Sequence, residues 1–177
     1  DLPQAWEGPQ GYGSASVVIA IIDSGVDTDH ADLRLVTGYD FGDDDADPDD
    51  NAAGAGHGTA CAGVAAALNN GIGAVGVAPG CSIMPLKVAE SDGYMYFSAV
   101  QNALYYAADH GAHIVSMSFG APLKTDAATE AALQYADAAG VVLLAATGNG
   151  NKGDIQYPAA SPYVIAVGAA SPGGDRK

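Results

Sequence analysis

The chain has 177 residues, of which 21 are acidic and 6 basic, and its formal net charge is −15. A chain of this length can bury the core of one domain, and an apolar content of 49% is typical of packed globular structure rather than of disorder. The negative charge disfavours binding to nucleic acid or to an anionic membrane surface, and no apolar run reaches the roughly 18 residues that a membrane span needs.

Five apolar segments predict strands. The first is the run at 17–22, which is followed by Asp and Gly; runs of this kind are typical of strands buried on both faces. The pattern recurs, in chain order, in CSIMPLKVA, GAHIVSMSFG, GVVLLAATGNG and SPYVIAVGAA. Helices are predicted between them at 58–68, 97–110 and 125–139, the last with Thr125 as N-cap. The alternation predicts an α/β fold with a mainly parallel sheet flanked by helices.

Polar groups follow several of these strands. Asp23 follows the first strand, and the segments 118–120 and 147–149 follow two later ones. Because functional groups in a parallel sheet gather beyond the carboxyl ends of its strands, we expect these groups to meet at one edge. His57 should join them from the start of its helix. The sequence thus predicts a carboxylate, an imidazole and an amide in one place.

Asp23 and His57 suit a common task. Asp23 follows a continuous apolar strand, and burying its carboxylate without a partner would be costly. A histidine whose other ring nitrogen does chemistry is a suitable partner, because the carboxylate fixes its tautomer and stabilises the imidazolium. Taken singly, Asp23 is better explained as a cap on the turn at Gly25, and His57 as an ordinary histidine at a helix start.

The two cysteines, Cys61 and Cys81, allow at most one disulfide. Cys61 lies four residues after His57 and therefore on the same helical face. We interpret it as a small buried thiol rather than as a catalytic one.

An acidic run lies before His57. Seven of the 18 aspartates fall between Asp40 and Asp50, in the sequence YDFGDDDADPDDN. Closely spaced oxygen ligands without His or Cys suit Ca²⁺, although the glycine and terminal Glu of an EF-hand are missing. A solvated acidic run is an equally good interpretation of the pattern alone.

In combination, these motifs resemble those of the subtilisin-like serine peptidases, the subtilases. The resemblance runs, in order, through AIIDSGVDTDHADL, GHGTACAGVAAALNNGIGAVGVAP, MPLKV, IVSMSFG, LLAATGN and YPAASPYVIAVGA. It implies a three-layer α/β fold and a serine endopeptidase acting through an Asp-His-Ser triad. A nucleotide-binding α/β protein is disfavoured because no glycine-rich phosphate loop follows the first strand.

The resemblance also assigns roles to residues. It makes Asp23 the triad aspartate, His57 the general base and Asn149 the side-chain donor of the oxyanion hole. The family holds an extended peptide along a segment that corresponds here to Ser118, Phe119 and Gly120. The pocket for the fourth residue before the cut would be shaped by Phe97, Gly93 and Met117, and the pocket for the first by Gly148, Gly150 and Gln156.

The family's nucleophile lies in a downstream Gly-Thr-Ser-Met-Ala turn that does not occur in this sequence. We therefore expect residues 1–177 to be the N-terminal part of one catalytic domain, with the serine on a missing or separate C-terminal segment. The chain is interpreted as a piece of a peptidase nicked near SPGGDRK, as part of a longer polypeptide, or, least favoured, as a natural truncated binding protein.

Calcium is implied at two places. Subtilases of the thermitase and kexin-like groups bind it in an acidic loop before the His motif. By this resemblance the ligands are Asp40, Asp43, Asp45, Asp47 and Asp49, with Asp44 and Asp50 less favoured. A second site in the family corresponds to Asp32, Leu68, Asn70, Ile72 and Ala74, with Gln4 as a candidate N-terminal ligand.

The leading interpretation is therefore a secreted or cell-envelope subtilisin-like endopeptidase that binds calcium. Its partners would be protein or peptide substrates, the C-terminal segment with the serine, and a propeptide. The alternative is an inactive subtilase fold that binds a peptide or a partner protein.

Overall fold

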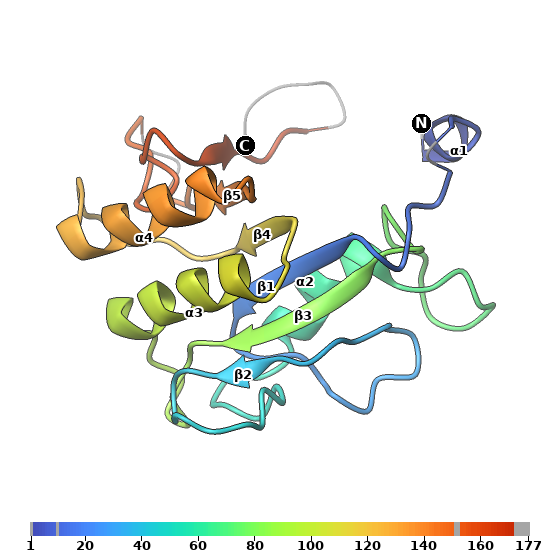
Figure 1. Cartoon of the computed structure of the whole chain (residues 1–177), viewed down its shortest axis with the longest axis horizontal. Helices are drawn as coiled ribbons and strands as arrows, with labels where there is room; N and C mark the ends of the chain where they lie inside the picture. The colour runs from blue at the N-terminus through green and yellow to red at the C-terminus, as the bar shows by residue number, and fades with distance from the viewer. Residues whose placement is uncertain (1, 10, 151–152, 172–177) are drawn as a thin grey trace.

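A computed structural model describes residues 2–9, 11–150 and 153–171 (Figure 1). Its six strands form one sheet in the order β2-β3-β1-β4-β5-β6, and all neighbouring strands run parallel. The strands are β1 (Val18–Asp23), β2 (Tyr39–Asp40), β3 (Ser82–Lys87), β4 (Ile114–Met117), β5 (Val142–Ala146) and β6 (Ile165–Val167). The helices are α1 (Leu2–Trp6), α2 (His57–Ala66), α3 (Phe97–Asp109) and α4 (Ala127–Ala138). The predicted α/β fold with a mainly parallel sheet is confirmed.

The sheet is covered on both faces. Alternate residues of β1 enter two separate apolar clusters: Ala20 and Ile22 pack in the larger cluster with α3 and α4, and Ile19 and Ile21 in a smaller one with α2. Figure 1 shows α3 and α4 on one side of the sheet and α2 on the other. Because both faces of β1 are buried, its sequence is apolar without alternation.

The register brings three strand ends together. β1 lies between β3 and β4, and Ile22 pairs with Met117, which in turn pairs with Ala145 of β5. Asp23, the residue after Met117 and the residues after Ala146 therefore extend beyond the same edge of the sheet, as predicted. His57 reaches this edge as the first residue of α2.

Some element boundaries differ from the prediction. The helix at 58–68 begins at His57 and ends at Ala66, because Leu68 turns away to donate its backbone N–H to Asp32 O. The N-cap of α4 is Asp126 rather than Thr125, because the Asp126 carboxylate accepts from the backbone N–H of Thr129. α1 and β2 were not predicted, and both are very short.

Two further observations complete the fold. None of the helices in the part of the chain that the structure describes is long and apolar enough to cross a membrane. The segment 172–177, where the sequence analysis places a nick, lies outside the described residues.

Candidate active site

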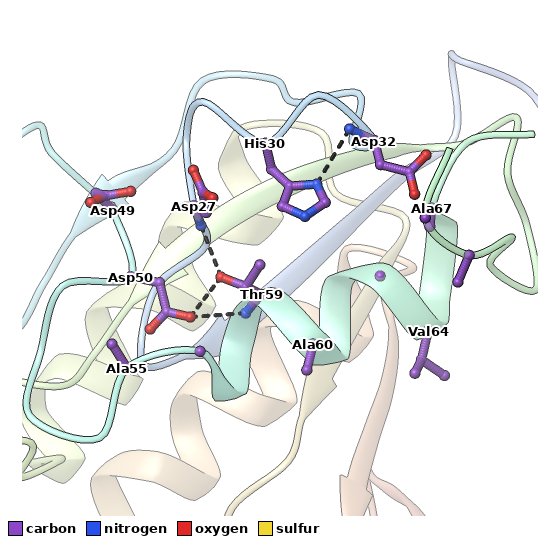
Figure 2. Close-up of a pocket in the computed structure, with 14 residues that line it drawn as sticks. Asp27, His30, Asp32, Asp49, Asp50, Ala55, Thr59, Ala60, Val64 and Ala67 are labelled. Carbon is purple, nitrogen blue, oxygen red and sulfur yellow. Dashed lines mark hydrogen bonds between the residues drawn. The ribbon is translucent and has the colours of Figure 1, made fainter. Parts of the chain in front are cut away.

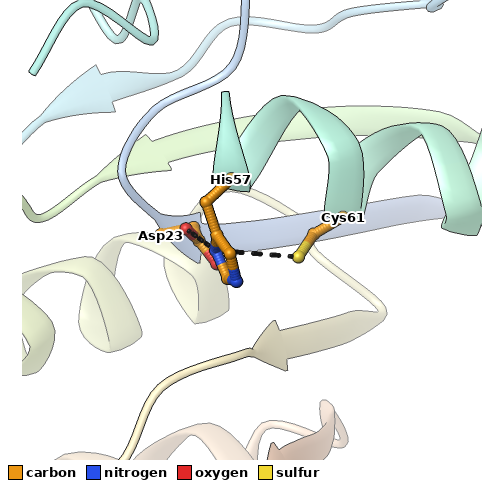
Figure 3. Close-up of side chains that lie close together, drawn as sticks. All are labelled: Asp23, His57 and Cys61. Carbon is orange, nitrogen blue, oxygen red and sulfur yellow. Dashed lines mark hydrogen bonds and ion pairs between the residues drawn. The ribbon is translucent and has the colours of Figure 1, made fainter. Parts of the chain in front are cut away.

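Asp23 and His57 form a close pair beyond the end of β1 (Figure 3). Nδ1 of His57 lies 2.7 Å from Oδ1 of Asp23, and Oδ1 also accepts the backbone N–H of Ser24 at 2.7 Å. Asp23 is 1% exposed, whereas the His57 side chain is 55% exposed. A buried carboxylate thus orients an imidazole whose far side is open to solvent, which is the arrangement expected of a general base and its partner.

Close packing of α2 against β1 makes this pair possible. A Cβ atom at Gly58 would clash with the carbonyl oxygen of Gly25 and would lie 3.0 Å from Cβ of Asp23. Glycine at 58 therefore allows the first turn of α2 to reach the end of β1. Without this approach His57 could not contact a carboxylate that is itself buried at the sheet.

The first turn of α2 is held by side chains from outside the helix. Ser24 Oγ accepts the backbone N–H of Gly58 at 3.0 Å and donates to Asp50 at 2.9 Å. The other oxygen of Asp50 accepts both the backbone N–H and the hydroxyl of Thr59, at 3.1 and 2.6 Å. These contacts satisfy helix N–H groups that have no partner within the helix. Sequence analysis named Asp50 only as a doubtful calcium ligand and missed this role.

The pKa of the Asp50 carboxyl reflects these contacts. Burial alone would raise it, but hydrogen bonds from Thr59, from the backbone of Gly56 and from Ser24 outweigh burial and lower the pKa below its ordinary value. Asp50 is therefore ionised at neutral pH, and its negative charge lies at the positive end of the α2 dipole.

Cys61 lies beside the pair. Its Sγ is 3.9 Å from Nδ1 of His57, one helical turn away, and the thiol is half-buried rather than fully buried as expected. Cys61 and Cys81 are both free. Burial raises the pKa of the Cys61 thiol, as does the charge of Asp23, against a lowering hydrogen bond with Ser118. Cys61 is therefore a neutral thiol at neutral pH and a poor nucleophile.

Ligand atoms of Asp23, His57 and Cys61 lie within 4.8 Å of one another, a spacing within which a metal ion could be held.

A cleft lies close in sequence to the predicted substrate segment and to Asn149, although these residues are not among those that line it. Ser118 and Phe119 are half-buried and Gly120 is exposed at the end of β4, while Asn149 is exposed beyond β5. The cleft has a volume of about 670 Å³. It is lined by Pro122, Leu123, Lys124, Thr147, Gly148, Gly150, Gly153, Asp154, Ile155, Gln156 and Ala160.

The side chain of Gln156 fills space between Gly148, which lines this cleft, and Gly120. A Cβ atom at Gly120 would lie 2.7 Å from Oε1 of Gln156, and one at Gly148 would lie 2.5 Å from its Cδ. A backbone hydrogen bond holds Gln156 in place, because its N–H donates to Thr147 O at 3.1 Å. A carboxamide thus forms one wall of the pocket that sequence analysis assigned to the first substrate residue.

The residues predicted to shape the fourth-residue pocket differ in exposure. The half-buried ring of Phe97 lies 5.9 Å from the ring of Tyr157, whereas Met117 is 1% exposed within the core. Gly93 adopts φ 87° and packs against Ala53. Phe97 is therefore the side chain of this set that is partly accessible, while Met117 belongs to the core.

Comparison with known proteins agrees with this geometry. A family model described as the subtilase family matches residues 14–177. The chain belongs to the subtilase family of serine peptidases. It is 42% identical over 168 residues to thermitase from Thermoactinomyces vulgaris, 40% over 164 residues to subtilisin DY from Bacillus licheniformis, and 37% over 171 residues to subtilisin E from Bacillus subtilis.

These matches cover 93%, 90% and 94% of this chain. They cover 58% of thermitase, 58% of subtilisin DY and 44% of subtilisin E. The chain therefore spans about half the length of the subtilases that it matches.

Asp32, the predicted subtilase calcium ligand, lies in an acidic cleft of about 890 Å³ (Figure 2). It is 3% exposed, and its Oδ1 has no hydrogen-bond partner among the described residues. The loop 68–74 wraps its carboxylate: a Cβ at Gly73 would lie 2.5 Å from Oδ2, and Asn70 Oδ1 accepts the N–H of Ile72. Trp6 donates to Val77 O, so α1 with Gln4 lies next to the segment that follows this loop. A buried carboxylate oxygen without a partner fits a bound cation.

The acidic loop, residues 40–51, is arranged differently from the predicted calcium site. Asp40 is 1% exposed and its Oδ2 lies 2.6 Å from Nζ of Lys87, a residue that sequence analysis did not single out. Asp45, Asp47 and Asp49 each accept one backbone N–H through Oδ1, from Asp47, Asp49 and Thr28 respectively. Within residues 2–9, 11–150 and 153–171, no three carboxylates of this loop bring their oxygens within 4.8 Å of one another.

Replacing Gly58 by alanine should separate the pair. We expect Gly58→Ala to lower the free energy of unfolding by about 1–3 kcal/mol, because the new methyl group overpacks the contact with Gly25. The matched control is Gly63→Ala in the same helix, where a Cβ meets no described atom within 4 Å and where alanine should stabilise α2 by up to about 1 kcal/mol. Urea unfolding measures both, and equal effects of the two substitutions would contradict this account of α2 packing.

Proposed function

We propose that this chain supplies the Asp-His part of a serine endopeptidase, and that the nucleophilic serine comes from a segment outside it. The observation that carries the proposal is the 2.7 Å contact between the buried Asp23 and the exposed His57. A purely structural histidine has no need of a buried carboxylate on one side and open solvent on the other. Membership in a family of serine peptidases supports the same conclusion.

The contact between Asp23 and His57 supports one proton path. With His57 Nδ1–H donating to Asp23, Nε2 carries a lone pair toward the open side of the ring. A serine hydroxyl placed there would give its proton to Nε2 while its oxygen attacks the substrate carbonyl carbon. His57 would then pass the proton to the departing amine, leaving an acyl-enzyme that water hydrolyses by the same route. Asp23 stays ionised and stabilises the imidazolium.

Asn149 and the segment 118–120 would hold the substrate. The side-chain amide of Asn149 would donate to the oxygen that becomes negative in the tetrahedral intermediate. An extended peptide would align along Ser118, Phe119 and Gly120 as an added strand. Their position at the same sheet edge as Asp23 and His57 supports these roles.

The segment carrying the serine would also cover exposed apolar surface. All three residues of β6 are exposed, with Ile165 at 55% and Val167 at 49%. A strand or helix packed there would bury them. We further propose a secreted or cell-envelope location and a propeptide as a folding partner, both by analogy with the family.

Calcium is proposed at Asp32. Its buried, unpartnered oxygen and the surrounding loop 68–74 support binding through Asp32, Leu68, Asn70, Ile72 and Ala74. Bound calcium would stabilise the native state and hold this loop against α2. It would take no part in peptide hydrolysis.

The first test combines intact-protein mass spectrometry with a fluorophosphonate that labels activated serines. We expect a label on a serine outside this sequence, and we expect His57→Ala to abolish it. Asp23→Asn should lower kcat by about 10³–10⁴-fold because the imidazole loses its tautomer. His110→Ala, at the exposed end of α3, serves as the control. A folded protein that takes no label would contradict the proposal and favour a peptide-binding module.

The calcium proposal predicts sensitivity to chelation. A chelator should lower the thermal midpoint on the order of 5–15 °C, and Asp32→Asn should remove most of this difference. Asp29→Asn, three residues away and exposed, changes the same charge and should leave the difference intact. If Asp32→Asn kept the full chelator effect, calcium would have to bind elsewhere.

The position of Gln156 predicts substrate preference. Gln156→Ala should empty the space between Gly120 and Gly148 and raise kcat/KM for large side chains at the first position, relative to small ones, roughly tenfold or more. Gln134→Ala on the exposed face of α4 is the control. Peptide substrates that differ only at that position measure the ratio, and an unchanged ratio would exclude Gln156 from the pocket wall.

A further inference from the structure

Lys87 joins the two ends of the acidic loop. It is the last residue of β3 and is 2% exposed. Its Nζ lies 2.6 Å from Asp40 Oδ2 at the start of the loop and donates to Asn51 Oδ1 at its end, at 2.9 Å. Asp43 Oδ2 lies 3.6 Å away. The ammonium therefore has three oxygen partners, and all of them come from this one loop.

Both carboxylate oxygens of Asp40 already have partners. Its Oδ2 faces Lys87, and its Oδ1 accepts the backbone N–H groups of Gly42 and Asp43 at 2.8 and 3.1 Å. Backbone bonds in both directions between Asp40 and Asp45 close the turn around it. Asp40 thus organises the loop from within.

The donor set does not fit calcium at Asp40. Calcium needs six to eight oxygen ligands, and a divalent ion at Asp40 would either displace the ammonium or lie beside it. Displacement would leave a buried, unpaired lysine, and an ion beside the ammonium would bring two positive charges together at a buried carboxylate. The ligand set implied by the resemblance to calcium-binding subtilases therefore disagrees with the geometry at Asp40.

We propose that the Lys87 ammonium is the resident counter-ion of the acidic loop, so that the start of this loop keeps its fold without calcium. The pKa of Lys87 agrees with this role. Burial alone would lower it, but the hydrogen bond and charge of Asp40 and the charge of Asp43 outweigh burial and raise the pKa above its ordinary value. The two carboxylates that contact the Lys87 ammonium thus favour its charged form.

Hydrogen exchange tests the proposal independently of peptidase activity. The intact protein is labelled and then digested, and mass spectrometry follows the peptides that contain the backbone amides of Gly42, Asp43 and Asp45. These three amides donate to Asp40. In the unmodified protein we expect equal protection in chelator and in excess calcium. In Lys87→Met we expect exchange in chelator to quicken by more than about tenfold, since a buried charge loses its partner, and calcium to restore protection. Lys124→Met, an exposed lysine, is the charge-matched control.

Two outcomes would overturn the proposal. One is protection in the unmodified protein that collapses in chelator and returns with calcium, because calcium would then hold the loop. The other is a Lys87→Met protein whose loop stays protected in chelator. If Lys87→Met does not fold, the comparison on the unmodified protein still decides between lysine and calcium.

Discussion

The site depends on one buried charge, the carboxylate of Asp23. It lies at the end of a strand covered on both faces, is 1% exposed, and one of its oxygens has no hydrogen-bond partner among the described residues. A carboxylate in such a position needs compensation, and the imidazole of His57 and the N–H of Ser24 supply it through the other oxygen. The strand that makes the core therefore also fixes the orientation of the histidine.

Compensation of Asp23 requires the first turn of α2 to stay in contact with the end of β1. The anchor is a chain of contacts from Asp50 through Ser24 to the N–H of Gly58, with Thr59 on a second branch. The Asp50 carboxylate and the Ser24 hydroxyl both accept N–H groups of the first turn, and the helix dipole stabilises the negative charge of Asp50 at this end. Gly58 removes the steric barrier and Asp50 supplies the attraction.

The local pattern of apolar and polar residues was enough to predict the sheet, the helices α2 to α4 and the proximity of Asp23 and His57. Each of these follows from a run of apolar residues, a following polar group and the geometry of parallel strands. Asp50 and Lys87 could not be found this way, because their contacts with Ser24 and Asp40 arise from tertiary packing that no local pattern of apolar residues marks. Asp126 displaced Thr125 as the cap of α4 because two neighbouring residues can both cap, and only the backbone path decides which carboxylate or hydroxyl reaches Thr129.

The ends of β1 and β3 explain why both ends of the stretch from Asp40 to His57 contact the sheet. Asp23 and Lys87 are paired in register on these adjacent strands, and both are buried. Each requires a partner from outside the sheet, and the two partners, His57 and Asp40, are the last and first residues of the same stretch. The stretch from Asp40 to His57, which contains the acidic loop, is thereby held at both ends against the sheet edge that carries the site. Excess negative charge in between can then remain in solvent, because the buried Lys87 and Asp40 already compensate each other.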